Sequence, residues 1–399
     1  MKNFNNYPIK NKKVLLRSDL NVPVKNGIII DKTRIHAIKQ TINYFRKNNN
    51  KIFLLSHFGR PKGKFNNNFS LKFLCSTLAD CFSVNKIHFA PSLDIQIINE
   101  IKRTMHKGEI CLLENIRFYI EEENNDLGFA KNLASCFDVY VNDAFSVSHR
   151  NHVSITGITK FLPSVAGLAL SNEVDNLNKL LINPNKPIAA IIGGSKVSTK
   201  LSLLNNLVGL FDTIIIGGAM ANTFLLAKGF NIGKSLIEKD LVKEANNILR
   251  NSNDLNCKII LPIDVICADN LSNPKNINLV KVNKIRKDQM VLDIGKNTIQ
   301  IIQTHLKDFK MILWNGPLGA FETKPFDKGT NQIIQILKNL SLNQNIIIAA
   351  GGGETVVAIK ETKTENCFSY ISNAGGAFLE WLEGKESPGI KALKENRIP

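Results

Sequence analysis

Short apolar runs recur along the whole chain of 399 residues. Runs of four to eight apolar residues bounded by turn residues are typical of strands buried on both faces of a parallel sheet. In the first half we predict strands near 13–18, 51–57, 86–90, 109–114 and 138–142. In the second half we predict strands at 188–192, 213–216, 258–261, 290–293, 311–314 and 345–349.

Helical stretches such as Thr33–Lys47 and Leu71–Cys81 alternate with these strands, which predicts an α/β protein with parallel sheets. A longer helical stretch, Ala169–Leu181, follows Pro163 and Gly167 without an apolar strand. Because the chain is longer than one core usually supports, we expect two domains connected by this helix.

Several strands of the first half end in, or run on to, a basic side chain. Arg17 follows its apolar run directly, His57 follows the next run after one serine, and Arg117 lies four residues beyond Leu113. His149 and Arg150 follow the run at 139–141. The ligand crevice of a parallel sheet lies beyond the carboxyl ends of its strands. Cations gathered at that edge predict a site for a small, multiply charged anion.

Strands of the second half end in glycine instead. The glycine-containing ends are Gly193–Gly194, Gly217–Gly218, Asn315–Pro317 and Gly351–Gly353. Glycine at a strand-to-helix turn lets backbone N–H groups approach a phosphate, and the helix N-terminus adds about half a positive charge. Two different anion sites in one chain indicate transfer of a charged group between two ligands.

Lys196 and Lys200 are four residues apart, so we predict that they share one face of a helix that opens after Gly193–Gly194. Two lysines there repel each other unless an anion lies between them, which favours a phosphate site over a solvated helix start. The segment does not match the Walker A pattern.

Composition narrows the functional classes. The net charge is +17, but the lysines are scattered among asparagines without a basic run of six, which favours a solvated surface, with weak affinity for polyanions as the alternative. The seven cysteines contain no C-x-x-C pair and indicate buried apolar positions in a reducing cytosol. The polar start lacks the apolar segment of a signal peptide and no run is long enough to cross a bilayer, so we predict a cytoplasmic protein.

Seven segments in order resemble the signature segments of the phosphoglycerate kinase family. They are Arg17–Pro23, Ser56–Pro61, Leu113–Phe118, Asn142–Phe145, Gly193–Val197, Trp314–Pro317 and Gly351–Thr355. The resemblance extends over nearly the whole chain, to Ser387–Gly389.

The resemblance implies two Rossmann-like three-layer domains joined by a helical hinge. The implied boundaries are 1–168 for a phosphoglycerate-binding domain, 169–181 for the hinge, 182–384 for a nucleotide-binding domain, and 385–399 for a segment that returns to the first domain. The implied reaction is the glycolytic, reversible phosphoryl transfer from 1,3-bisphosphoglycerate to MgADP, which gives 3-phosphoglycerate and MgATP. The implied protein is a monomer that works by hinge bending. With the scattered lysines we expect no specific nucleic-acid partner, and without a long apolar run we expect no membrane partner.

The resemblance also implies site residues. Those for phosphoglycerate are Asp19, Asn21, Arg34, His57, Arg60, Arg117 and Arg150. Arg34 and Lys196 would be catalytic because they stabilise charge on the transferring phosphoryl group. For Arg17 two interpretations remain open: it contacts the ligand, or it forms an ion pair with a neighbouring carboxylate.

The implied nucleotide residues lie in the second half. They are Lys196, Lys200, Gly217, Gly218, Asn315, Pro317, Glu322, Gly351, Gly352, Gly353, Glu354 and Thr355. Glu354 would contact the Mg²⁺ of the nucleotide, directly or through water, at a position where the family usually has aspartate. The segment Ser372–Gly376 resembles a family motif that normally contains a threonine and another glycine. Because this chain lacks them, the motif's contact with the transferring phosphoryl group does not carry over directly.

Other classes of protein fit less well. A nicotinamide dehydrogenase needs G-x-G-x-x-G early in the chain, whereas the nearest match begins at Gly351 and has Val356 in place of the third glycine. A nucleic-acid-binding protein would explain the charge but not the strands that end in glycine. A kinase for another carboxylate would not require the same order of basic segments.

Overall fold

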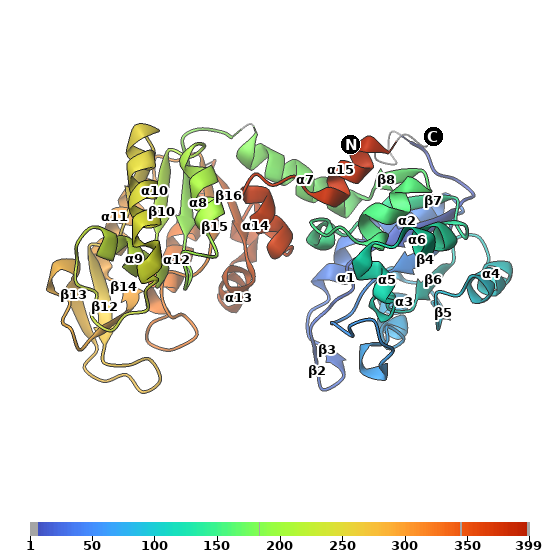
Figure 1. The fold of residues 1–399 in the computed structure, drawn as a ribbon, viewed down its shortest axis with the longest axis horizontal. Helices are drawn as coiled ribbons and strands as arrows, with labels where there is room; N and C mark the ends of the chain where they lie inside the picture. Colours follow the sequence, from blue (N-terminus) through green and yellow to red (C-terminus); the bar gives the residue numbers. More distant parts are fainter. Residues whose placement is uncertain (1–6, 183, 344, 397–399) are drawn as a thin grey trace. The chain divides into compact units, whose positions relative to one another are not determined.

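The computed structural model describes residues 7–182, 184–343 and 345–396. The chain forms two compact units (Figure 1). The first contains the residues up to Asp175 and those from Glu386 onward, and the second contains Asn176–Lys385. The boundary falls within helix α7 (Leu168–Leu181). Among the described residues, no helix is long and apolar enough to cross a membrane.

Six parallel strands form the sheet of the first unit, in the order β5-β6-β4-β1-β7-β8. They are β1 (Lys13–Arg17), β4 (Lys51–Leu55), β5 (His88–Ala90), β6 (Ile110–Leu113), β7 (Val139–Asn142) and β8 (Ser164–Ala166). Arg17, the last residue of β1, lies opposite Leu55 of β4 and Asn142 of β7. The central strands therefore end at one level.

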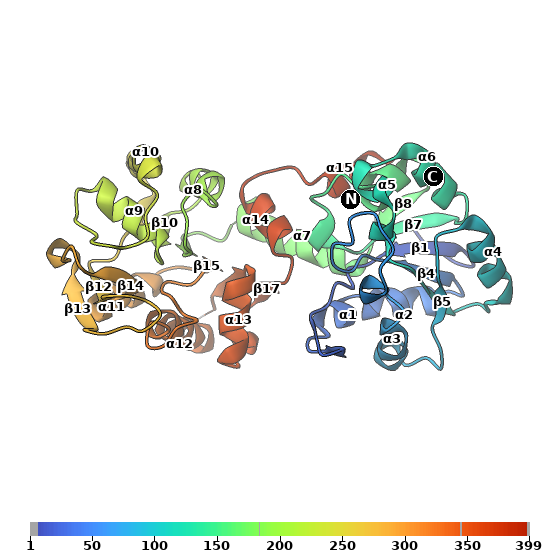
Figure 2. The same cartoon turned by 60° about the horizontal axis from the view of Figure 1, so that its bottom comes forward.

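Helices cover both faces of this sheet because the order of the strands reverses direction after β5, and right-handed crossovers then change face. The helices of one face are α1 (Thr33–Ala37), α2 (Lys39–Lys47) and α3 (Leu74–Phe82), and those of the other are α4 (Ile95–Thr104), α5 (Ile120–Asn124) and α6 (Leu127–Ala134). Figure 2 shows α2 and α3 on the opposite side of β1 and β4 from α5 and α6. Val14 and Leu16 of β1 pack in one core with Phe45 of α2.

The second unit has a six-stranded parallel sheet in the order β11-β10-β9-β15-β16-β17. Its strands are β9 (Ile188–Ile192), β10 (Thr213–Ile216), β11 (Lys258–Ile260), β15 (Met311–Asn315), β16 (Ile347–Gly351) and β17 (Tyr370–Ser372). From β9 the chain first adds strands on one side, β10 and β11, and then on the other, beginning with β15. The place between β9 and β15 is therefore a switch point, where ligands bind in open α/β sheets.

Helices also cover both faces of the second sheet. They are α8 (Leu201–Val208), α9 (Met220–Ala227), α10 (Val242–Asp254), α11 (Lys296–Leu306), α12 (Lys328–Asn343), α13 (Gly353–Glu361) and α14 (Gly376–Leu382). One core joins Trp314 of β15 to Ile302 of α11 and Leu337 of α12. With this arrangement, the predicted α/β class with two parallel sheets is confirmed.

A three-stranded antiparallel sheet, in the order β13-β12-β14, lies between β11 and β15 in the chain. Its strands are β12 (Asp264–Ala268), β13 (Asn278–Lys281) and β14 (Met290–Ile294), and a separate small hairpin joins β2 (Val24–Lys25) to β3 (Ile28–Ile29). The strand predicted at 290–293 is therefore present, but its assignment to the main series of strands was wrong. Its partner β12 contains a run of only four apolar residues, Val265–Ala268, which we did not assign to a strand.

Two other local predictions need correction. We expected no strand before the connecting helix, but β8 lies there and pairs with β7. Three residues are too few for a strand to show a pattern. The helix predicted over Thr33–Lys47 is interrupted at Ile38 and forms α1 and α2.

The final helix, α15 (Pro388–Glu395), belongs to the first unit. The residue that follows it, Asn396, is buried, and its side-chain amide donates to the carbonyl oxygens of Thr159 at 2.6 Å and Leu162 at 3.0 Å. Its side-chain oxygen accepts from the Ser164 N–H at 3.1 Å. One amide group therefore ties the end of the chain to the start of β8.

We expect Asn396→Ala to destabilise the first unit by about 1–3 kcal/mol, because it leaves buried backbone groups without partners. Urea unfolding followed by circular dichroism measures this loss. Asn132→Ala, which removes an exposed amide on α6, is the matched control and should leave the midpoint unchanged. Equal midpoints for Asn396→Ala and the control would contradict the role of Asn396.

Candidate functional site

Polar residues gather where the parallel strands of the first unit end. Arg34 Nη1 lies 2.7 Å from Asp19 Oδ2 and donates to the Asn21 carbonyl oxygen at 3.0 Å. Ser146, from the segment after β7, donates to the same Asp19 oxygen at 2.5 Å. Asp19 therefore orients Arg34.

The loop after β4 is fixed from two sides. The side-chain oxygen of Asn21 accepts from the Gly59 N–H at 3.0 Å, and Arg117 Nη1 donates to the Gly59 carbonyl oxygen at 2.8 Å. Arg60 is the next residue and is exposed, as is Arg150. In the described part of the chain, neither arginine has an ion-pair partner, so both guanidinium groups remain available to a ligand.

His57 differs from the arginines around it. It is 4% exposed, and burial, followed by the charges of Arg17, Arg117 and Arg34, holds its pKa well below its usual value. The imidazole is therefore neutral at pH 7 and offers a hydrogen bond. The expectation that His57 adds positive charge to this edge was wrong, because burial among cations disfavours its protonated form.

Arg17 does not simply contact a ligand or pair directly with a neighbouring carboxylate, the two roles that we considered for it. It is 2% exposed, and its Nε donates to Ser154 Oγ at 2.8 Å. Its Nη1 donates to the Ser18 carbonyl oxygen at 2.5 Å, and its Nη2 lies 3.2 Å from His57 Nδ1. No motif in the sequence marks Ser154, which lies 137 positions from Arg17.

In the second unit, close packing of backbone explains several of the glycines at the strand ends. Gly218 has a φ of +67°, and a Cβ atom there would lie 2.6 Å from the Gly194 carbonyl oxygen. Gly316 has a φ of +98°, and a Cβ atom there would lie 2.6 Å from the Gly193 carbonyl carbon. These glycines let the turns after β9, β10 and β15 meet at the switch point.

Lys200 lies at that junction. It is 9% exposed, and its ammonium group donates to both the carbonyl and the side-chain oxygen of Asn315, the former at 3.1 Å. Burial lowers the pKa of Lys200 to about 8, although the charge of Glu354 opposes this shift. A buried ammonium beside a turn can bind a phosphate oxygen.

Lys196 lies elsewhere, and the predicted helix face shared with Lys200 was wrong. Helix α8 begins at Leu201, so both lysines precede it, and Lys196 is exposed while Lys200 is buried. Val197, which lies between them, is buried. Slight burial would raise the pKa of Glu238, but the pKa is lowered by hydrogen bonds from Ser198 and Val197 and by the charge of Lys196. Lys196 therefore lies near this carboxylate.

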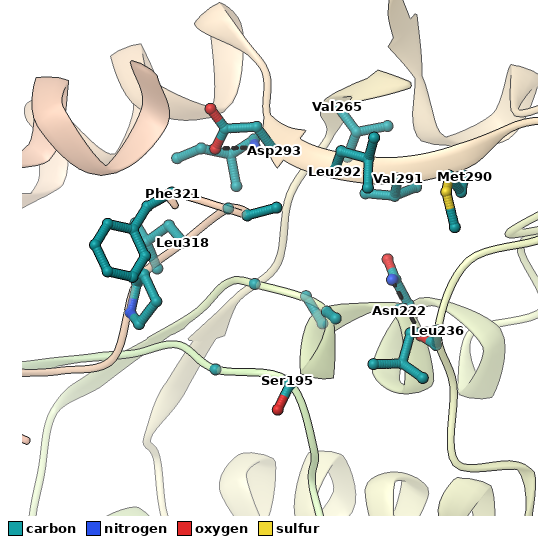
Figure 3. A pocket seen from close by; sticks show the side chains of 18 of the residues that line it. Ser195, Asn222, Leu236, Val265, Met290, Val291, Leu292, Asp293, Leu318 and Phe321 are labelled. Carbon is teal, nitrogen blue, oxygen red and sulfur yellow. Dashed lines mark hydrogen bonds between the residues drawn. The ribbon is translucent and has the colours of Figure 1, made fainter. Parts of the chain in front are cut away.

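A cavity of about 280 Å³ opens beside the switch point (Figure 3). Of the residues predicted to bind nucleotide, Gly218, Pro317, Glu322 and Glu354 line it. The remaining ones lie outside the lining: Lys196, Lys200, Gly217, Asn315, Gly351, Gly352, Gly353 and Thr355. The cavity itself is mainly apolar, with Leu236, Val265, Met290, Leu318 and Phe321 among its lining residues, which suits a flat aromatic group.

Hydrogen bonds connect most of the strand-end residues beside the cavity. The Asn315 amide donates to the Gly351 carbonyl oxygen at 2.7 Å, and Thr355 Oγ1 accepts from the Gly316 N–H at 2.7 Å. Helix α13 begins at Gly353, as expected, where a Cβ atom would meet no protein atom within 4 Å. The first turn of α13 is thus open to a ligand.

Asp293 is a cavity residue that sequence reasoning missed. It accepts from the Gly329 N–H at 2.7 Å, and burial raises its pKa to about 7. It therefore fixes the first turn of α12 against the cavity wall. Its position at the end of an apolar run was the available signal, but we assigned that run to the main sheet.

Comparisons with known proteins agree along the chain. A family model described as phosphoglycerate kinase matches residues 4–385. The phosphoglycerate kinases of Bartonella tribocorum and of Methylorubrum extorquens strain PA1 are both 44% identical, over 96% and 97% of this chain and 96% of each relative.

Solved structures give the same result. The phosphoglycerate kinase of Coxiella burnetii matches with a TM-score of 0.90 and 37% identity, over 99% of each chain. That of Pyrococcus horikoshii OT3 matches with a TM-score of 0.82 and 27% identity, over 99% of this chain and 98% of that one. The resemblance noted in the seven sequence segments is confirmed, and the chain belongs to the phosphoglycerate kinase family.

Proposed function

We propose that the chain transfers a phosphoryl group reversibly from the acyl phosphate of 1,3-bisphosphoglycerate to MgADP, giving 3-phosphoglycerate and MgATP. The observation that carries this proposal is the contrast between the two strand edges. The first unit offers the guanidinium groups of Arg34, Arg60, Arg117 and Arg150, and the second offers an apolar cavity beside an open helix N-terminus. A small polyanion suits the former and a nucleotide the latter.

The phosphoglycerate is bound by Asp19, Asn21, Arg34, His57, Arg60, Arg117 and Arg150. Guanidinium forks grip its phosphate and carboxylate oxygens, while Asp19 keeps Arg34 in place. His57 contributes a hydrogen bond without adding charge.

The nucleotide base lies in the cavity against Gly218 and Pro317, and Glu322 contacts the ribose. Lys200 and Asn315 lie beside the cavity, and the N–H groups of Gly353, Glu354 and Thr355 belong to the open first turn of α13. Backbone donors and the helix dipole there favour phosphate oxygens.

No covalent intermediate is required, because positioning and charge stabilisation supply the rate of such transfers. Arg34 and Lys196 stabilise the charge on the transferring group. Closure of the two units about α7 would exclude water during the transfer.

The residues present fit a Mg²⁺ ion that arrives with the nucleotide. No group of three or more His, Cys, Asp or Glu side chains suited to a metal occurs among the described residues. Glu354 lines the cavity as a single carboxylate, and Mg²⁺ is usually held by one or two carboxylates together with phosphates and waters. Glu354 would hold the ion, which neutralises phosphate charge when bound.

The protein acts as a monomer in the cytoplasm and needs no nucleic-acid or membrane partner. The monomeric state rests on the family resemblance, the lack of a nucleic-acid partner rests on the scattered lysines, and the cytoplasmic location rests on the pattern of cysteines. The seven cysteines are free in the structure, and five of them are buried.

A coupled assay of ATP formation from 1,3-bisphosphoglycerate and ADP tests the reaction directly. Arg34→Ala and Lys196→Ala should each lose kcat by orders of magnitude with smaller changes in KM, because their contacts strengthen as charge develops. Lys243→Ala, an exposed lysine on α10, is the control and should keep normal turnover. Near-normal kcat in either site variant would refute its catalytic role.

Calorimetry with each ligand alone tests the division between the two edges. Arg60→Ala should weaken 3-phosphoglycerate binding by about 1.5–3 kcal/mol, the scale of a charge-assisted hydrogen bond, and leave ADP binding unchanged. Arg103→Ala removes an exposed arginine from α4 and should alter neither affinity. Equal losses of both affinities in Arg60→Ala would argue against separate sites.

The pKa of Lys200, about 8, predicts a pH dependence of nucleotide binding. The pKa lies below that of an ordinary lysine, so the free protein loses this charge as pH rises through about 8. ADP affinity should therefore be level below pH 7 and fall by up to about tenfold per pH unit above 8, as expected for one linked proton. Lys200→Met should bind ADP more weakly and without this fall, and a parallel fall in both proteins would exclude Lys200 as its source.

A further inference from the structure

A chain of buried polar groups leads away from His57 beneath the basic edge of the first unit. Arg17 lies 3.2 Å from His57 Nδ1 and donates from Nε to Ser154 Oγ at 2.8 Å. Ser154 Oγ in turn donates to Glu122 Oε1 at 2.6 Å. None of these four residues is more than 4% exposed. The network therefore lies behind the ligand edge.

Each proton in this network has one assignment. A guanidinium group only donates hydrogen bonds, so His57 Nδ1 must accept from Arg17, and the imidazole proton must lie on Nε2. The Ser154 hydroxyl has a single proton, so it accepts from Arg17 and donates to Glu122. The guanidinium group of Arg17 can only donate and the carboxylate of Glu122 can only accept, so these two groups set the direction of every bond.

Glu122 supplies the negative charge. In the described part of the chain, no carboxylate oxygen lies within 4 Å of a side-chain nitrogen of Arg17, so Glu122 acts on the guanidinium through the Ser154 hydroxyl. Burial alone would raise the pKa of Glu122, but His152, 3.6 Å from Oε1, the charge of Arg17 and the bonds from Ser154 lower it. A buried guanidinium needs such compensation, because an uncompensated buried charge is costly.

Ser154 is itself held in place. Its N–H donates to Glu122 Oε2 at 2.8 Å, and its carbonyl oxygen accepts from the Tyr140 hydroxyl at 2.6 Å. The helical turn that contains it, Val153–Gly157, is buried throughout. The hydroxyl therefore has little freedom to turn away from Arg17.

The other end of the network is open. Within the described residues, no group accepts a hydrogen bond from His57 Nε2. This nitrogen is also not one of the fully buried polar atoms without a partner, so it reaches solvent. A hydrogen-bond donor is thus available at the ligand edge.

We propose that Glu122 and Ser154 are positioning residues for the reaction: they hold Arg17 so that His57 keeps its proton on Nε2 and donates to an anionic oxygen of the phosphoglycerate. The inference rests on the proposed function, since the ligand is the one assigned to this edge. Glu122 and Ser154 do not touch the ligand. They act through the state of the imidazole.

Nitrogen NMR of the full-length chain labelled with ¹⁵N-histidine tests the first step without ligand. His57→Asn identifies the signals of His57 by their loss. At pH 7 we expect the neutral imidazole with its proton on Nε2. A proton on Nδ1, or an imidazolium, in the unmodified protein would overturn the proposal whatever any variant does.

Variants test the dependence on the network. Ser154→Ala should give His57 mixed protonation states and raise KM for 3-phosphoglycerate about tenfold, with kcat and KM for ATP within twofold of normal. Ser164→Ala removes a buried serine hydroxyl that donates to the Leu162 carbonyl oxygen in the same unit, and it should change none of these values. Glu122→Gln keeps the shape of the acceptor without its charge and should act in the same direction as Ser154→Ala. Normal His57 signals and a normal KM in folded Ser154→Ala or Glu122→Gln would overturn the proposal.

Titration with 3-phosphoglycerate separates this inference from the proposed function. The ligand should shift the His57 signals in the unmodified protein, and binding that leaves them in place would overturn the ligand step of the inference. Lack of turnover in the coupled assay would overturn the proposed function instead. Because the protonation state of His57 is measured without ligand, the two failures remain distinct.

Discussion

Burial of parallel strands on both faces is the constraint on which the candidate sites of both units depend. Helices cover each six-stranded sheet on two sides, so the strands themselves are almost wholly apolar and polar groups collect where they end. The register brings Arg17 level with Asn142 in the first unit, and Asn315 level with Ile192 in the second. Functional groups distant in sequence therefore share one edge of each sheet without long loops.

The two edges use this constraint in different ways. The first unit places side-chain cations there and buries one of them, Arg17, whose charge is compensated through Ser154 by Glu122. The second unit brings three turns into close backbone contact and buries the Lys200 ammonium against Asn315. One edge thus depends on polar side chains packed behind it, whereas the other depends on the absence of side chains at the turns.

The sequence predicted the features that depend on local pattern. Central strands such as β9 and β15 were identifiable because every residue in them is buried, and the helix start at Gly353 followed from a glycine-ended strand. The partly exposed strand β13 was missed because its pairing with β12 is not encoded by an apolar run. The prediction that Lys196 and Lys200 share one helix face was wrong because the helix begins only at Leu201. Ser154 and Glu122 carry no motif, and their importance arises only when folding brings them beneath Arg17.

Glycine illustrates why the remainder of the site needed the structure. In the sequence, Gly218, Gly316 and Gly353 look alike, since each follows an apolar strand. In the structure, Gly218 and Gly316 have positive φ and lie against other backbone or Lys200, so the fold itself requires them. Gly353 has neither restriction, and a methyl group there would enter open space. Protein packing therefore does not account for the glycine at 353, and under the proposed function this open space in front of α13 would be left for a phosphate of the nucleotide.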